Sequence, residues 1–251
     1  MKRQEILDRA KPILFNTEMV RAILDGRKTV TRRRVKYKYS NTEMKMRTDK
    51  YGSRLIEIQK NIEGETFGKN PDGTTWHKLL GYIEPMPPYK KGDILYVRET
   101  WGISNLDYDD KVVYIVYKAS ENEKDEGCRA ARLPNDKFEK LDDSMAENSS
   151  DWRPSIHMPK EAARIFLRVT DVRVERLQAI TEEQARTEGV GDPYHYQPPE
   201  WYDHHGLANN YLRDAFAGLW NSTIKKSDID RYGWDANPFV WVIKFEMVEV
   251  E

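Results

Sequence analysis

Cysteine is almost absent from this sequence, since Cys128 is the single cysteine among 251 residues. One cysteine excludes a disulfide within the chain and a zinc site built from several thiolates, and it is typical of a protein of the reducing cytoplasm. The sequence also lacks an apolar run of the length that spans a membrane, and no signal-type apolar stretch follows its basic N-terminus. We therefore expect a soluble, cytoplasmic protein without membrane contacts.

Net charge is nearly absent as well, because 41 lysines and arginines are balanced by 42 aspartates and glutamates. The whole chain therefore creates no field that attracts a polyanion, and a contact with nucleic acid must come from a local basic patch. Segment 24–38 (LDGRKTVTRRRVKYK) contains seven basic residues and two threonines, with no acid after Asp25. Such a segment is expected at a solvated strand edge, at a phosphate-binding surface or around a reaction centre.

Helices are predicted where capping residues precede apolar residues at helical spacing. Asn16 or Thr17 begins the first helix and Gly26 ends it, whereas Thr181 and Gln184 form a capping box at the start of another. Short strands joined by long links favour a small curled sheet or barrel over a βαβ fold. The predicted strands lie at 28–35, 93–100, 163–177 and 237–250, and a further helix begins at 209 or 210.

Two long segments between these elements are interpreted as insertions into one domain that spans residues 1–251. The first insertion, about 38–90, is polar and contains short strand-like runs. The second, about 104–150, contains the β-prone run KVVYIVYK and then an acidic stretch that we expect to be mobile.

Four blocks of this sequence read ILDGRKTVTRR, KGDILYVRETW, RVTDVRVERLQAITEEQARTEGV and NPFVWVIKF, and with their surroundings they cover a little under half of the chain. In this order they resemble the ASCH family. More narrowly, the chain looks like the longer ASCH proteins often found in phages and prophages. The resemblance implies an α+β fold, namely a small PUA-like (ASCH) β-barrel with a few peripheral helices and the two long insertions.

The family includes a small bacterial amidohydrolase that cleaves N4-acetylcytidine with a lysine, a threonine and a glutamate. The string G-R-K-T-x-T places the lysine at Lys28 and the threonine at Thr31, and the glutamate falls on Glu188. The resemblance thus implies hydrolysis of an N-acylated cytidine-type base, with Lys28 as base, Thr31 as nucleophile and Glu188 orienting or carrying a proton. Other relatives bind RNA or modified bases, and one is reported as a ribonuclease.

The chemistry of these residues agrees with such a reaction, because cleaving an amide needs a nucleophile, a base and a donor for the oxyanion. Lys28 is a base only if its pKa is lowered, and the charges of Arg27, Arg32 and Arg33 act in that direction. Residues three apart on a strand face opposite sides, so Lys28 and Thr31 converge only if Lys28 lies in the preceding turn. Arg27, Arg32 and Arg33 are also candidates for binding the ligand, and Arg33, in phase with Thr31, is expected to bind a phosphate or a base edge.

Three further groups are candidates for binding. The loop 191–206 is rich in aromatic residues, and Tyr194, Tyr196 and Trp201 are expected either to stack on a base or to cover the end of the barrel. Glu99, late in its predicted strand, is expected to reach the barrel mouth. The histidines of the loop lack the spacing of a metal site, so neither a metal nor a cofactor is expected.

The expected partner is RNA or a modified nucleoside, and the sequence does not indicate an oligomeric state. Two alternatives to the hydrolase stay open. One is a non-catalytic module that binds RNA or a modified base, and the other is a ribonuclease or a phage accessory protein that binds a host protein.

Overall fold

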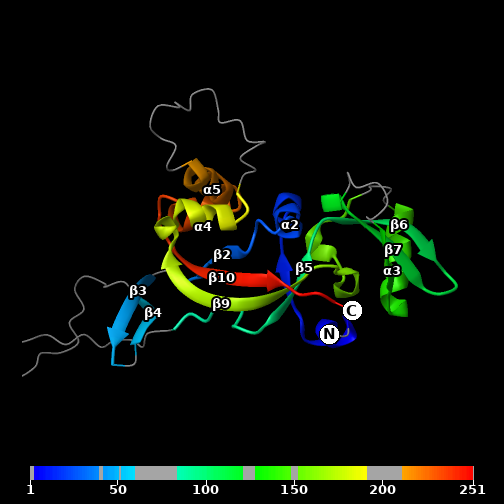
Figure 1. Ribbon diagram of the computed structural model, residues 1–251, viewed down its shortest axis with the longest axis horizontal. Helices are drawn as coiled ribbons and strands as arrows, with labels where there is room; N and C mark the ends of the chain where they lie inside the picture. Colours follow the sequence, from blue (N-terminus) through cyan, green and yellow to red (C-terminus); the bar gives the residue numbers. More distant parts are fainter. Residues whose placement is uncertain are drawn as a thin grey trace, which may run out of the picture.

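The computed structural model describes residues 3–39, 42–50, 52–59, 84–120, 128–147, 152–190 and 211–250. These ranges contain ten strands in three sheets and six α-helices (Figure 1). Every helix within them is too short or too polar to traverse a lipid bilayer. The predicted α+β class is therefore confirmed.

A five-stranded sheet forms the centre of the described structure. Its strands in spatial order are β1 (Lys11–Leu14), β5 (Ile94–Arg98), β9 (Phe166–Arg176), β10 (Phe239–Met247) and β2 (Val30–Arg34). β1 runs parallel to β5, and all other neighbours are antiparallel. The last four of these strands fall within the four segments that alternation predicted, so the sequence located most of the sheet.

The central sheet is strongly curved along β9 (Figure 1), but its described strands do not close a barrel. The edge strands β1 and β2 share no backbone ladder. A side chain bridges them instead, because the Arg33 guanidinium donates to the Leu14 carbonyl at 2.9 Å and lies 5.2 Å from the centre of the Phe15 ring. The two edge strands are thus joined by a side chain and not by a backbone ladder, and a closed PUA-like barrel is not found in the described residues.

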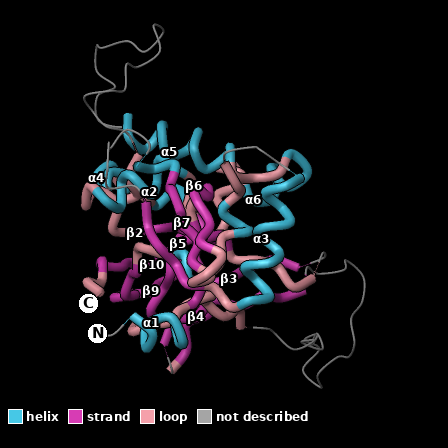
Figure 2. Tube along the Cα trace, turned by 90° about the vertical axis from the view of Figure 1, so that its right-hand side faces the viewer, coloured by secondary structure: helices cyan, strands magenta, loops and turns pink. Residues whose placement is uncertain are grey.

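Two different apolar cores cover the two faces of this sheet. Helices α4 (Glu182–Thr187) and α5 (Tyr211–Ser222) lie together on one side of β10 (Figures 1 and 2), and their apolar residues form a cluster with Val242. The next residue, Ile243, belongs to another cluster that includes the apolar face of α2 (Thr17–Leu24). Each large apolar side chain buried in these clusters contributes about 1.5–3 kcal/mol to folding.

The alternation along β2 divides its charged and hydroxyl side chains between these faces. Val30 belongs to the cluster of α4 and α5, so Arg32 and Arg34 project to that side. Thr31 pairs with Ile243 of β10, and Thr31 and Arg33 project to the other side. The basic segment 24–38 thus contributes side chains to both faces of the central sheet.

The two predicted insertions contain the remaining sheets, which lie at opposite ends of the central sheet (Figure 1). β3 (Thr42–Asp49) and β4 (Gly52–Gln59) form a hairpin in the first insertion. The second sheet consists of β6 (Trp101–Asp107), β7 (Val112–Tyr117) and β8 (Cys128–Arg132).

Helix α3 (Asn135–Glu147) occupies part of the stretch that we expected to be mobile. Phe138, which is 1 % exposed, anchors α3 in a core cluster with Trp101 and with α1 (Arg3–Arg9). Leu141 of the same helix packs against this cluster as well, so the described apolar side chains of α3 face the core. The remaining described helix is α6 (Ile229–Tyr232).

Candidate functional site

Lys28 lies in the loop between α2 and β2, where the argument from strand geometry required it. Gly26 adopts φ 73°, and the backbone N–H of Lys28 then donates to the Ala22 carbonyl at 2.8 Å. This bond folds the loop back against α2 and turns the lysine side chain into the protein, where Lys28 is 3 % exposed.

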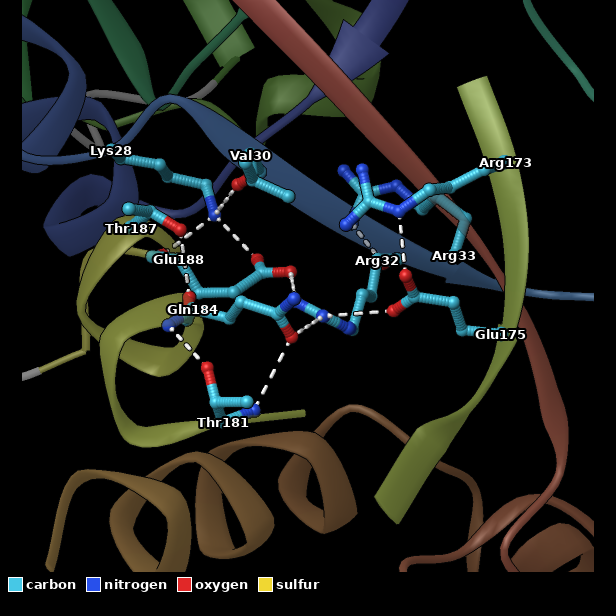
Figure 3. Close-up of polar contacts among 10 residues, drawn as sticks. All are labelled: Lys28, Val30, Arg32, Arg33, Arg173, Glu175, Thr181, Gln184, Thr187 and Glu188. Atoms are coloured by element: carbon cyan, nitrogen blue, oxygen red, sulfur yellow. Dashed lines mark hydrogen bonds and ion pairs between the residues drawn. The ribbon is translucent and has the colours of Figure 1, made fainter. Parts of the chain in front are cut away.

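The Lys28 ammonium donates three hydrogen bonds, one for each of its protons (Figure 3). The acceptors are the carbonyl of Val30 at 2.8 Å, the carbonyl of Glu188 at 2.7 Å and the Glu188 carboxylate oxygen Oε2 at 2.9 Å. The first of these acceptors belongs to the peptide that joins Val30 to Thr31. The lysine thus lies beside the start of β2 and is in direct contact with a residue 160 positions further along the chain.

Glu188 is brought to Lys28 by the way α4 ends. The predicted capping box of Thr181 and Gln184 begins this helix, and Glu188 is its C-cap residue. Gly189 follows with φ 78°, and a Cβ atom there would lie 2.8 Å from the Cβ of Ala22. The glycine therefore permits both the turn and the close approach of α4 to α2, a second role that the sequence pattern did not reveal.

Arg32 holds the second oxygen of the Glu188 carboxylate. Its guanidinium donates to Glu188 Oε1 at 3.0 Å, to Gln184 Oε1 at 2.9 Å and to Glu175 Oε2 at 3.4 Å (Figure 3). Gln184 Oε1 also accepts the backbone N–H of Thr181 in the capping box, at 3.2 Å. Arg32 is 3 % exposed, so it is positioned to orient Glu188, and its contact with a ligand stays a prediction.

Burial is the largest influence on the lysine of this site. Removal from water lowers the pKa of Lys28, while the charge and hydrogen bond of Glu188 raise it. The positive charges of Arg33 and Arg32 lower the pKa further, as the sequence suggested. Lys28 therefore loses its proton more readily than a free lysine, which is the direction that a general base requires.

Thr31 is buried on the other face of β2, at 2 % exposure. Within the described part of the chain, its hydroxyl has no hydrogen-bond partner. The hydroxyl is therefore free to bond a ligand or to react.

Two cavities lie near this site, one lined by Lys28 and the other by Arg33, and neither Thr31 nor Glu188 lines them. A small one of about 100 Å³ is lined by Lys28 together with Gly26 and Thr29. A larger one of about 440 Å³ is lined by Arg33 and by Trp241 of β10. The larger volume is in the range of small-molecule sites.

The structure places two predicted ligand contacts away from the Lys28–Glu188 pair. Arg27 is exposed and pairs with Asp25 at 2.8 Å. Glu99 is buried rather than at a barrel mouth, and both of its carboxylate oxygens accept from Arg164, at 2.9 and 3.0 Å. Burial raises the pKa of Glu99 and Arg164 opposes this. Glu99 thus forms a buried ion pair, and its contact with a ligand stays a prediction.

The predicted aromatic contacts Tyr194, Tyr196 and Trp201 lie outside the described residues. Among the residues that the structure does describe, no three histidine, cysteine, aspartate or glutamate side chains are grouped so that they could hold a metal ion.

Comparison of the chain with protein-family models, with curated proteins and with solved structures finds no match. The resemblance to the ASCH family therefore depends on the four sequence blocks and on what the site geometry adds to them.

Proposed function

We propose that this protein is an ASCH-type amidohydrolase that cleaves an N-acylated cytidine-type base, with Lys28, Thr31 and Glu188 as its catalytic residues. One observation carries the proposal. The two members of the trio that are farthest apart in sequence, Lys28 and Glu188, form a buried contact of 2.9 Å. That contact also places the ammonium against the peptide before Thr31.

Proton transfer within the pair begins the proposed reaction. Moving one proton from Lys28 Nζ to Glu188 Oε2 converts the ion pair into an amine and a carboxylic acid. Desolvation favours this neutral pair, because two charges buried together lose their hydration. The amine then accepts the hydroxyl proton of Thr31 while the hydroxyl oxygen attacks the acyl carbonyl carbon.

The acyl group is transferred to Thr31 and then to water. As the bond between the carbonyl carbon and N4 of the base breaks, Glu188 gives its proton to the departing nitrogen. A water molecule next attacks the threonine ester, and its proton passes to the Glu188 carboxylate. The bond between the acyl carbon and the Thr31 oxygen then breaks, the Lys28 ammonium gives a proton to that oxygen, and the carboxylic acid leaves. Glu188 finally returns its proton to Lys28, which restores the starting ion pair.

Release of cytidine from N4-acetylcytidine tests this function. The wild type is expected to release cytidine, and Thr31→Val to lose at least about 100-fold in rate, because the nucleophile is gone. Thr48→Val is a matched control, since Thr48 is exposed on the β3–β4 hairpin and its hydroxyl pairs with that of Ser53. Equal rates for Thr31→Val and the wild type would contradict the proposal.

A second function, binding of RNA or a modified base without turnover, is favoured by a different observation. All three protons of the Lys28 ammonium are already bonded, so the pair is fully satisfied as a structural element. Such a module would bind N4-acetylcytidine and release no cytidine. The turnover assay, combined with a direct measurement of binding, separates the two functions.

A further inference from the structure

The larger cavity joins part of the predicted first insertion to the central sheet. Its wall is formed by residues 33–36 at the end of β2, by Trp241 of β10 and by residues from 85 to 89 that precede β5. Residues 85–89 lie at the end of the insertion that has no counterpart in the minimal ASCH protein. This wall is therefore a feature of the present chain and not of the small barrel alone.

Two cations of this wall have no acidic partner within the described residues. The Arg33 guanidinium bonds only backbone carbonyls, those of Leu14 and Arg32, although it is half-buried. Lys36 is exposed and makes no ion pair there. By contrast, the neighbouring Arg34 is bound to Asp228 at 3.1 Å.

The lack of an ion-paired carboxylate among the described residues affects the pKa of Arg33. Burial lowers the pKa of its guanidinium, and the Glu188 carboxylate only partly offsets that effect. A planar guanidinium without a carboxylate is suited to a forked pair of hydrogen bonds with an anion, and phosphate is the anion whose oxygens fit this geometry well. The cavity thus offers a place for one phosphate group.

Aromatic and apolar surfaces complete the cavity. Tyr89 is held in place by the bond from its hydroxyl to the Pro12 carbonyl, at 2.6 Å. Trp241 lies opposite Arg33 across the strand pair, and Met86 is 72 % exposed at the rim. Rings beside cations are the combination that binds a nucleotide, because the base stacks while the phosphate is paired.

Arg33 connects this cavity to the proposed reaction site. It follows Thr31 by two residues on the same face of β2, about 7 Å further along the strand. A single nucleotide, or two adjacent ones, can span that separation with an acylated base at Thr31 and a phosphate at Arg33.

We propose that this cavity is a nucleotide subsite, and that it makes the preferred ligand a phosphate-bearing nucleotide instead of a free nucleoside. The position of the acylated base rests on the proposed function, but binding of phosphate in the cavity does not require turnover. The phosphate belongs either to a mononucleotide or to an oligonucleotide.

Calorimetric titration of the full chain with cytidine, its 3′- and 5′-monophosphates and a short oligocytidylate tests the subsite. One of the monophosphates is expected to bind about tenfold more tightly than cytidine, the usual gain from a charged hydrogen-bonded pair. Binding of the oligonucleotide more tightly than either monophosphate would assign the phosphate to a strand, and equal binding would assign it to a mononucleotide. Equal affinities for cytidine and both monophosphates would overturn the subsite.

Matched lysine variants show whether the cavity is responsible. Lys36→Ala is expected to reduce the ratio of the affinity for the monophosphate to the affinity for cytidine about threefold. Lys38 is an exposed lysine outside the cavity wall, so Lys38→Ala should leave this ratio unchanged. An equal reduction of the affinity ratio in both lysine variants would contradict the assignment of the phosphate to this cavity. Arg33→Met is expected to lose the preference for the monophosphate over cytidine, and Arg33→Lys to retain part of it.

Turnover separates this inference from the proposed function. Preferential binding of a monophosphate without release of an acyl group would leave the subsite standing and remove the hydrolase. If the protein instead hydrolyses N4-acetylcytidine and the monophosphate of N4-acetylcytidine with the same kcat/KM, the hydrolase stands and the subsite is removed.

Discussion

Two opposed influences act on Lys28 at the scale of single residues. Burial and the nearby guanidinium groups lower the pKa of this lysine, and Glu188 raises it. Because the lowering effects prevail, the neutral amine forms below the ordinary lysine pKa of 10.5. The proposed reaction needs one proton to stay on the Lys28–Glu188 pair, so turnover should be lost when Lys28 gives that proton to water.

The pH profile is therefore the first prediction. We expect kcat/KM for N4-acetylcytidine to fall as the pH rises toward 10.5, because loss of the proton shared by Lys28 and Glu188 removes the acid that protonates the departing nitrogen. Arg33→Met removes a charge that lowers the pKa of Lys28, so the profile should move to higher pH. Arg33→Lys retains the charge and should leave the midpoint near the wild-type value.

A rate that rises steadily from pH 6 to 10, or an Arg33→Met profile that moves to lower pH, would contradict this account. The effect of pH on stability has the opposite sign to its effect on the rate. A lysine whose pKa is lowered on folding binds fewer protons in the folded state, so its penalty is complete below the folded pKa and disappears as pH rises toward 10.5.

The second prediction concerns the stability of the buried ion pair. Lys28→Met leaves Glu188 paired with Arg32, whereas Glu188→Gln leaves two buried cations without their shared counter-charge. We expect Glu188→Gln to lower the free energy of unfolding by about 3 kcal/mol or more, and Lys28→Met by less. Urea denaturation of both single variants and the double variant measures the coupling, and equal losses would contradict the shared role of Glu188.

At the scale of elements, the end of α4 determines whether the site forms. Gly189 combines a left-handed backbone with a close approach to α2, since an added Cβ would lie 2.8 Å from Ala22 and 3.0 Å from Lys28. Gly92 has a similar φ of 89°, but an added Cβ there meets nothing within 4 Å. Comparing alanine substitutions at these two glycines therefore separates the free-energy cost of backbone strain from the cost of crowding.

The third prediction uses that pair. Gly92→Ala should cost about 1 kcal/mol from backbone strain alone. Gly189→Ala should cost at least about 1 kcal/mol more and should also reduce turnover, because α4 must move away from Lys28 and carry Glu188 with it. Thermal unfolding and the cytidine assay measure both effects. Similar losses for the two variants would show that the close approach does not hold the site together.

Local signals made several elements predictable. Asn16 caps α2 with a side-chain bond to the N–H of Met19, and the capping box at Thr181 is present as the sequence suggested. These features depend on residues three apart. The partners of Arg32 and Glu99 were not predictable in this way, because their ion pairs join elements 156 and 65 positions apart.

At the scale of the whole molecule, the insertions account for most of what the sequence left undetermined. β7 was visible as a β-prone run, but docking of α3 depends on the burial of Phe138 against another part of the chain. The absence of a backbone ladder between β1 and β2 in the described residues was not predicted either. The Arg33 guanidinium and the Leu14 carbonyl that it contacts are 19 positions apart, so no local pattern predicts their contact.

The near-zero net charge leads to the fourth prediction, which concerns salt. With a formal net charge of −1, a nucleic acid should be held by the local cations of the cavity alone. Two such contacts give a slope of about −1.4 for the logarithm of the affinity for a single strand against the logarithm of the salt concentration. Titration with oligocytidylate at several salt concentrations measures it, and a slope steeper than about −4 would indicate an extended basic surface.

The most direct test of the central claim compares two buried glutamates in one assay. Glu188 and Glu99 each pair with an arginine inside the protein, but only Glu188 also contacts Lys28. We predict that the wild type and Glu99→Gln release cytidine from N4-acetylcytidine at rates within about fivefold, and that folded Glu188→Gln loses about 100-fold or more. No release by the wild type, or equal rates for the two variants, would contradict the assignment of the site.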